Sequence, residues 1–267
     1  MTPRRTMGVA FAVLSAGFVW LRDLAWWDES ADSLSVLAGV LLYVWFARPW
    51  QWRPEAGLLP LGRVGLGLGL FLVGSVVDST VLLALGWCLA WQAWIASELV
   101  EGAPAAGLRL VALLFCAFPW VALGGQQIGW WFRYSGAAAT EYFFLLLGFA
   151  VERQGTFLLV QGQALAVDPA CAGLNVLQAM LLAGVALAHL QLPPPRRFWV
   201  GLAALVPLAW LANTARIITL GVAGLTFGAD TARGWFHHWG GWMVLCFMFV
   251  LTYGCFAALG RFRARRP

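Results

Sequence analysis

The chain has 267 residues, of which 61% are hydrophobic and 11% are charged, and its net charge is +5. Soluble domains carry about 25% charged residues, so this composition excludes an ordinary soluble domain and, with repeated apolar runs, predicts an all-α polytopic membrane protein. All basic residues are arginines, and they concentrate in short loops and in the C-terminal tail. That pattern is typical of cytoplasmic membrane-protein loops, so no nucleic acid is expected as a partner.

The apolar runs predict about eight transmembrane helices, which together form a single integral membrane domain over residues 1–267. The expected spans cover residues 7–21, 33–47, 64–77, 79–97, 108–123, 171–191, 198–224 and 239–259. With the N-terminus in the cytoplasm, the inner segments hold twelve arginines and the outer segments hold five. Because basic residues favour cytoplasmic loops, we expect a multi-pass protein of the plasma (inner) membrane with both termini in the cytoplasm.

The long connection at residues 124–170 falls on the expected outer side. Within it, residues 136–151 predict a short helix at the membrane interface. Thr156–Val160 and Gln163–Asp168 flank Gln161-Gly162, and two β-prone runs around a glycine-containing turn predict a small hairpin. Free strand edges are not stable in lipid, so we expect this hairpin to be extracytoplasmic. It leads directly into the sixth expected span.

Cys171 is the first residue of that span and a candidate nucleophile. A helix N-terminus favours the thiolate form of a cysteine, and its free backbone N–H groups can receive an oxyanion. Cys-Ala-Gly is also a common small-residue packing stretch, so position alone does not decide the role. The remaining cysteines lie in apolar runs and are interpreted as small hydrophobic residues; they are Cys88, Cys116, Cys246 and Cys255.

Arg216 lies inside the seventh expected span. It follows the start of that span by about 18 residues, or roughly 27 Å of helix, which places it near the outer boundary of the membrane. An ionisable residue inside a span indicates function. Near Cys171, its guanidinium would lower the thiol pKa or stabilise a developing oxyanion. Asn213 precedes it by one helical turn on the same face and could supply a second hydrogen bond.

His237 and His238 open the last expected span, again at its outer end. An imidazole there could protonate a leaving amine and later deprotonate an incoming nucleophile. His189 lies at the inner end of the sixth span and is interpreted as structural. A thiol, a guanidinium and an imidazole are thus predicted at one face of the membrane, a set suited to nucleophilic acyl transfer.

Three short motifs carry these residues, and together they resemble the exosortase/archaeosortase family of membrane transpeptidases. They are DPACAGL at 168–174, NTAR at 213–216 and HHWGGW at 237–242. The resemblance covers residues 140–260 well. It divides the chain into variable N-terminal helices at 1–123 and an exosortase-like catalytic half at 124–267.

The resemblance implies a cysteine peptidase or transpeptidase whose catalytic residues are Cys171, Arg216 and His237, with His238 and Asn213 as alternative or supporting residues. His237 is preferred because it stands four residues before Gly241. The family's common Cys-Ser-Gly is Cys-Ala-Gly here, so no serine hydroxyl is available at position 172. Implied partners are membrane lipids and exported proteins that carry a C-terminal motif, a transmembrane helix and a basic tail. No cofactor or metal is implied.

Three other functions fit the sequence less well. A transporter or lipid-binding protein that binds anions at Arg216 predicts inverted repeats, which the halves do not show, and tolerance of Cys171→Ala. The motifs of an intramembrane protease are missing: neither Ser75 nor Ser135 lies in a GxSG-like context, and Asp78 has no second intramembrane aspartate to pair with. A haem-handling protein would need a CxxCH motif or paired distant histidines.

Overall fold

The computed structural model describes residues 3–28, 30–120, 123, 126–166, 174–193, 195–228 and 237–261. Most of these residues are helical. The chain divides into two compact units, Met1–Gly125 and Gln126–Pro267.

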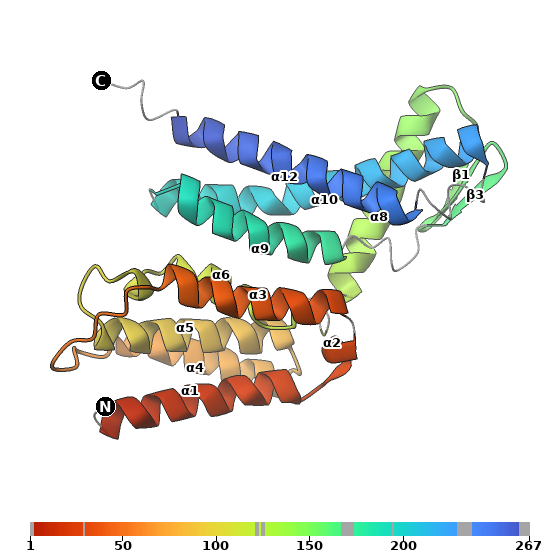
Figure 1. Ribbon diagram of the computed structural model, residues 1–267. Helices are drawn as coiled ribbons and strands as arrows, with labels where there is room; N and C mark the ends of the chain where they lie inside the picture. The colour runs from red at the N-terminus through yellow and green to blue at the C-terminus, as the bar shows by residue number, and fades with distance from the viewer. Residues whose placement is uncertain are drawn as a thin grey trace. The chain divides into compact units, whose positions relative to one another are not determined.

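The first unit is a helical bundle (Figure 1). Its helices are α1 (Pro3–Leu21), α2 (Ala25–Asp28), α3 (Ser30–Phe46), α4 (Leu61–Val76), α5 (Thr80–Glu98), η1 (Pro104–Ala106) and α6 (Leu110–Cys116). Helix α5 packs against α1, α4 and α6 and carries more buried residues than any other described helix of this unit. Glycines bring α4 and α5 close together, because a Cβ added at Gly86 would lie 2.5 Å from the backbone nitrogen of Phe71.

One expected span of this unit does not form as predicted. The sequence predicts a continuous helix over 108–123, whereas α6 ends at Cys116 and a turn follows at Ala117. Pro119 explains the break, because proline lacks a backbone N–H and disfavours the helical conformation of the residue before it.

The second unit contains α8 (Gln126–Leu146), α9 (Leu174–Gln191), α10 (Pro195–Phe227) and α12 (His237–Arg261), together with a three-stranded sheet. The 33-residue helix α10 contacts all three of the other helices. Two helices of the described chain, Thr80–Glu98 in the first unit and Pro195–Phe227 here, are long and apolar enough to cross a bilayer, judged by length and composition.

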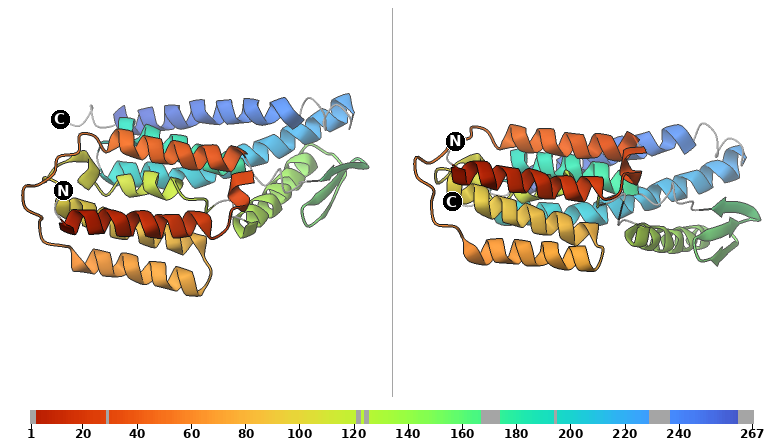
Figure 2. Two further views of the ribbon diagram at one scale, coloured as in Figure 1. Left: turned by 60° about the horizontal axis from the view of Figure 1, so that its bottom comes forward. Right: turned by 90° about the horizontal axis from the view of Figure 1, so that it is seen from below.

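The sheet has the order β1 (Val151–Gln154), β2 (Phe157–Val160) and β3 (Gln163–Ala166), and all its pairs are antiparallel. It lies at the C-terminal end of α8 (Figure 2). Strands β2 and β3 pair around Gln161-Gly162, the turn at which the sequence places a hairpin. Both turn residues have positive φ, 50° and 78°, as a two-residue type I′ turn requires.

Helix α8 differs from its prediction. The sequence places a short helix at 136–151, but the observed helix covers Gln126–Leu146 and the chain enters β1 at Val151. The residues before 136 include the polar residues Gln126, Gln127 and Arg133. They interrupt the apolar run, so hydropathy alone does not predict a helix there. Packing against α10 supplies the stability that the apolar pattern alone does not indicate.

Candidate functional site

The structure describes only part of the predicted catalytic set. Cys171 lies outside the described residues. His237 and His238 form the first turn of α12, but the positions of their side chains are also outside the described part. Asn213 and Arg216 are fully described, one helical turn apart on α10. The proximity of these two residues to Cys171 and His237 therefore stays a prediction.

The Asn213 side chain is buried, with only 1% of the residue's surface exposed. Neither its side-chain oxygen nor its side-chain nitrogen has a hydrogen-bond partner among the described residues. Buried amide groups in proteins are almost always hydrogen-bonded, because leaving one unpaired costs about 1–3 kcal/mol. An unpaired amide of this kind is suited to bind a group that arrives from outside the fold.

Two neighbours of Asn213 on α10 share this property. The Nε atom of Arg216 and the hydroxyl oxygen of Thr214 are buried, and neither finds a partner within the described part of the chain. In a helix, a threonine hydroxyl often bonds to the carbonyl one turn earlier, as Thr219 does to Ala215 (2.7 Å). That Thr214 does not do so adds a third unsatisfied polar group to the same turn.

Helix α8 forms one wall of this polar turn. Trp210 donates its indole N–H to the Ser135 hydroxyl (2.8 Å), which aligns α8 with α10. One residue later, a Cβ added at Gly136 would lie 3.5 Å from the Thr214 hydroxyl and 3.9 Å from the Asn213 amide nitrogen. The absence of a side chain at position 136 thus brings the backbone of α8 directly over the polar groups of α10.

Arg133 lies one turn before Gly136 and adds a second guanidinium to this region. Its Nε atom is buried and has no hydrogen-bond partner among the residues described. The carboxylate of Glu141, further along α8, accepts a hydrogen bond from the guanidinium of Arg153 on β1. This hydrogen bond raises the pKa of Arg153. In the sequence, Arg133 is one of the five arginines expected on the outer side, and its position in an otherwise aromatic stretch is the signal that distinguishes it from the others.

This turn of α10 and its neighbour α8 therefore offer hydrogen-bond donors to an oxygen-rich or anionic group. Arginine carries a permanent charge and five N–H donors, and the Asn213 amide adds two more. Among the side chains described, no group of three His, Cys, Asp or Glu residues gathers that could hold a metal ion.

Asn213 provides a direct test of whether this arrangement serves function or stability. Replacing Asn213 with leucine removes both unpaired polar atoms at similar volume, so we expect the thermal midpoint to rise by a few degrees. If the amide binds substrate, activity should fall at least tenfold in the same variant. The control is Thr252→Val on α12, whose buried hydroxyl also has no partner among the described residues but lies outside this turn, so we expect a stability gain without loss of activity. Unchanged activity in Asn213→Leu would assign the amide no functional role.

Comparison with known protein families gives a match that extends over most of the chain. The family model described as transmembrane exosortase matches residues 4–254. The match begins in α1, so it includes the N-terminal unit, for which the sequence motifs indicated nothing beyond general hydrophobicity. No curated protein and no solved structure matches the chain significantly.

Proposed function

The chain belongs to the transmembrane exosortase family, and on this basis we propose that it is a membrane cysteine transpeptidase or protease that cleaves C-terminal sorting signals of exported proteins. The observation that best supports the proposal is the pair Asn213 and Arg216. These residues form the Asn-x-x-Arg motif, and their buried polar atoms are unpaired among the described residues.

We propose that Cys171 acts as the nucleophile. Its thiolate sulfur forms a bond to a peptide carbonyl carbon of the substrate, and the carbonyl oxygen becomes an oxyanion. Arg216 donates hydrogen bonds to this oxyanion, with Asn213 as a second donor or as a positioning residue for the guanidinium. When the C–N bond breaks, His237 gives a proton to the leaving amine, and a thioester between Cys171 and the substrate remains.

In the second half of the reaction, His237 accepts a proton and the Cys171 thiolate is the leaving group. A water, amine or hydroxyl group attacks the thioester carbon and gives its proton to His237, and the thiolate of Cys171 leaves. Attack by water makes the protein a protease, whereas attack by an amine or a hydroxyl group makes it a transferase. His238 can replace His237 in this scheme, since both open α12.

The proposed orientation follows from the arginine distribution. About eight spans cross the plasma membrane, both termini lie in the cytoplasm, and the catalytic residues and the sheet β1–β3 lie on the extracytoplasmic face. This arrangement exposes the site to exported substrates that carry a C-terminal motif, a transmembrane helix and a basic tail. The basic tail would then remain on the cytoplasmic side with the inner arginines of the enzyme.

Hydroxylamine provides the test of the thioester step. Membranes that contain the chain and a substrate with a C-terminal sorting helix are treated with hydroxylamine, which attacks thioesters and leaves a hydroxamate at the new C-terminus of the substrate. We expect mass spectrometry to detect this hydroxamate only when the intact chain is present. Cleavage that yields a free carboxylate at every hydroxylamine concentration would refute the covalent mechanism, and no cleavage at all would refute the proposed function.

A further inference from the structure

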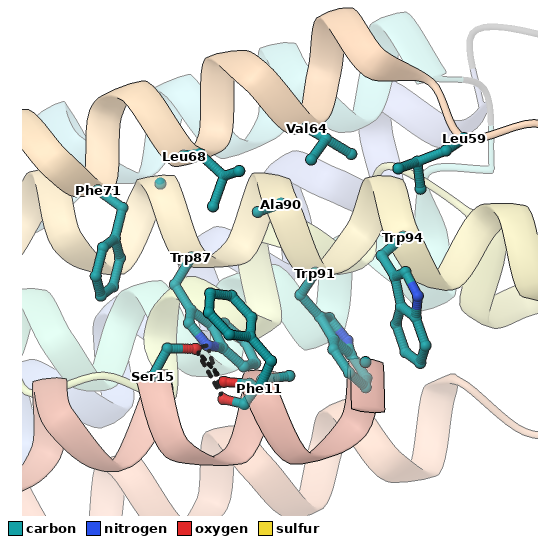
Figure 3. A pocket seen from close by; sticks show the side chains of 13 residues that line it. Phe11, Ser15, Leu59, Val64, Leu68, Phe71, Trp87, Ala90, Trp91 and Trp94 are labelled. Atoms are coloured by element: carbon teal, nitrogen blue, oxygen red, sulfur yellow. Dashed lines mark hydrogen bonds between the residues drawn. The ribbon is translucent and has the colours of Figure 1, made fainter. Parts of the chain in front are cut away.

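A narrow apolar groove lies in the first unit, between helices that carry none of the proposed catalytic residues (Figure 3). Helices α1 and α4 form its two sides, and α5 lies between them. Its volume is about 150 Å³, and its lining includes the side chains of Phe11, Val64, Leu68, Trp87, Trp91 and Trp94. The surface available to an occupant is therefore almost entirely hydrocarbon and aromatic.

Three polar groups in the wall, on Ser15, Trp87 and Trp91, are already paired. The Ser15 hydroxyl donates to the carbonyl of Phe11 (2.7 Å), and it accepts the indole N–H of Trp87 (3.0 Å). The indole N–H of Trp91 donates to the Tyr43 hydroxyl (2.8 Å). An occupant of the groove consequently gains apolar contacts and no strong hydrogen bonds from these side chains.

The size of the groove selects the kind of occupant. An apolar cavity of about 150 Å³ is enough to hold a benzene molecule, whereas a helix with its side chains is about 10 Å wide. A transmembrane helix of a partner protein therefore does not fit, and a segment of one hydrocarbon chain does.

One end of the groove is positively charged. Gly8 and Trp94 line this end, and one turn further along the same two helices lie Arg4 and Arg5 on α1 and Glu98 on α5. The Nε atoms of Arg5 and Arg4 lie 2.8 and 3.2 Å from the Glu98 carboxylate, which is fully buried. One carboxylate thus neutralises only one of two guanidiniums, and the Arg4 side chain remains 49% exposed.

Arg63 brings a further charge to the same rim. It lies in the first turn of α4, is exposed, and directly precedes Val64, which lines the groove. The segments that meet at this end, residues 3–8, 47–63 and 98–109, hold six arginines and three glutamates, an excess of three positive charges. That excess repels the basic tail of a sorting helix and attracts an anionic headgroup.

We propose that this groove binds one acyl chain of an anionic phospholipid, with the headgroup phosphate at Arg4 and Arg63. The apolar walls hold the hydrocarbon, and the excess charge selects an anionic over a zwitterionic headgroup. The site lies on different helices from Asn213 and Arg216, so the proposal does not depend on the enzymatic function.

Native mass spectrometry of the detergent-solubilised full chain tests this proposal. The protein is offered equal amounts of phosphatidylglycerol and phosphatidylcholine with identical acyl chains, and retained lipids are counted. We expect one retained phosphatidylglycerol in clear preference to phosphatidylcholine. Each of Arg4→Gln and Arg63→Gln should weaken its binding about fivefold, and the double variant about 25-fold. Arg261→Gln, which removes an exposed arginine at the end of α12, is the charge control.

A second pair of variants tests the apolar part of the site. Val64→Trp fills the groove and should abolish lipid retention, whereas Leu72→Trp adds the same indole at an exposed position of α4 outside the groove. Equal thermal midpoints of the two variants show that the fold is intact. Equal retention of both lipids by the wild type, full binding by the double arginine variant, or full binding by Val64→Trp would each overturn the proposal.

Discussion

Replacing Cys171 with alanine is expected to reduce processing of a sorting substrate by at least about 10³-fold, because the variant has no nucleophile to form the thioester. The measurement is the fraction of substrate that loses its C-terminal helix during co-expression, read as a change in size on a gel. The amount of enzyme in the membrane should not change, since removing a single thiol leaves the helices that define the fold in place.

The matched control is Cys246→Ala. Cys246 is an exposed free cysteine on α12, so its replacement removes an accessible thiol without touching the proposed nucleophile. We expect wild-type processing from this variant. If Cys171→Ala processed substrate at the wild-type rate, the alternative suggested by the sequence would gain support, namely a non-enzymatic membrane protein that binds an anionic ligand at Arg216.

Helix positions were predictable where the apolar pattern was continuous. The expected spans 64–77 and 79–97 correspond closely to α4 and α5, and 198–224 lies within α10. Long apolar runs have few alternatives in a membrane, because every backbone polar group must be hydrogen-bonded within the segment. The errors came where polar residues or a proline interrupt the pattern, as in α8 and at Pro119.

Strand β1 was not predicted, because it depends on pairing with another strand and not on a local apolar pattern. Strand β1 carries Glu152 and Arg153 and has no apolar run, so it is recognisable only through its pairing with β2. Part of the candidate site on α8 and α10 also depends on tertiary structure. Asn213 and Arg216 were predictable from their motif, whereas Arg133 and Thr214 became candidates only when the structure showed their buried atoms without partners among the described residues.

Arg216→Ala should lower the rate of substrate cleavage about 10²–10³-fold, the usual cost of losing one oxyanion donor. Arg216→Lys should recover only part of this loss, because lysine restores the charge but not the planar pair of donors. Arg22→Ala is the control: Arg22 is also predicted on the outer side, but it pairs with Asp78 in the first unit (2.6 Å). We expect near-normal cleavage from that variant.

The dependence of the Arg216→Ala rate on pH separates the two roles that a guanidinium can have beside a thiol. If Arg216 stabilises the oxyanion, the loss of rate should be the same at every pH, because the missing hydrogen bond cannot be replaced by deprotonation. If Arg216 instead favours the thiolate form of Cys171, raising the pH should restore the rate, because the thiol then ionises without help. Neither the Nε of Arg216 nor the amide of Asn213 has a partner among the described residues. This favours the first outcome, since both are donors available to a developing negative charge. Full recovery at high pH would therefore remove Arg216 from the oxyanion site and leave Asn213 as its principal side-chain donor.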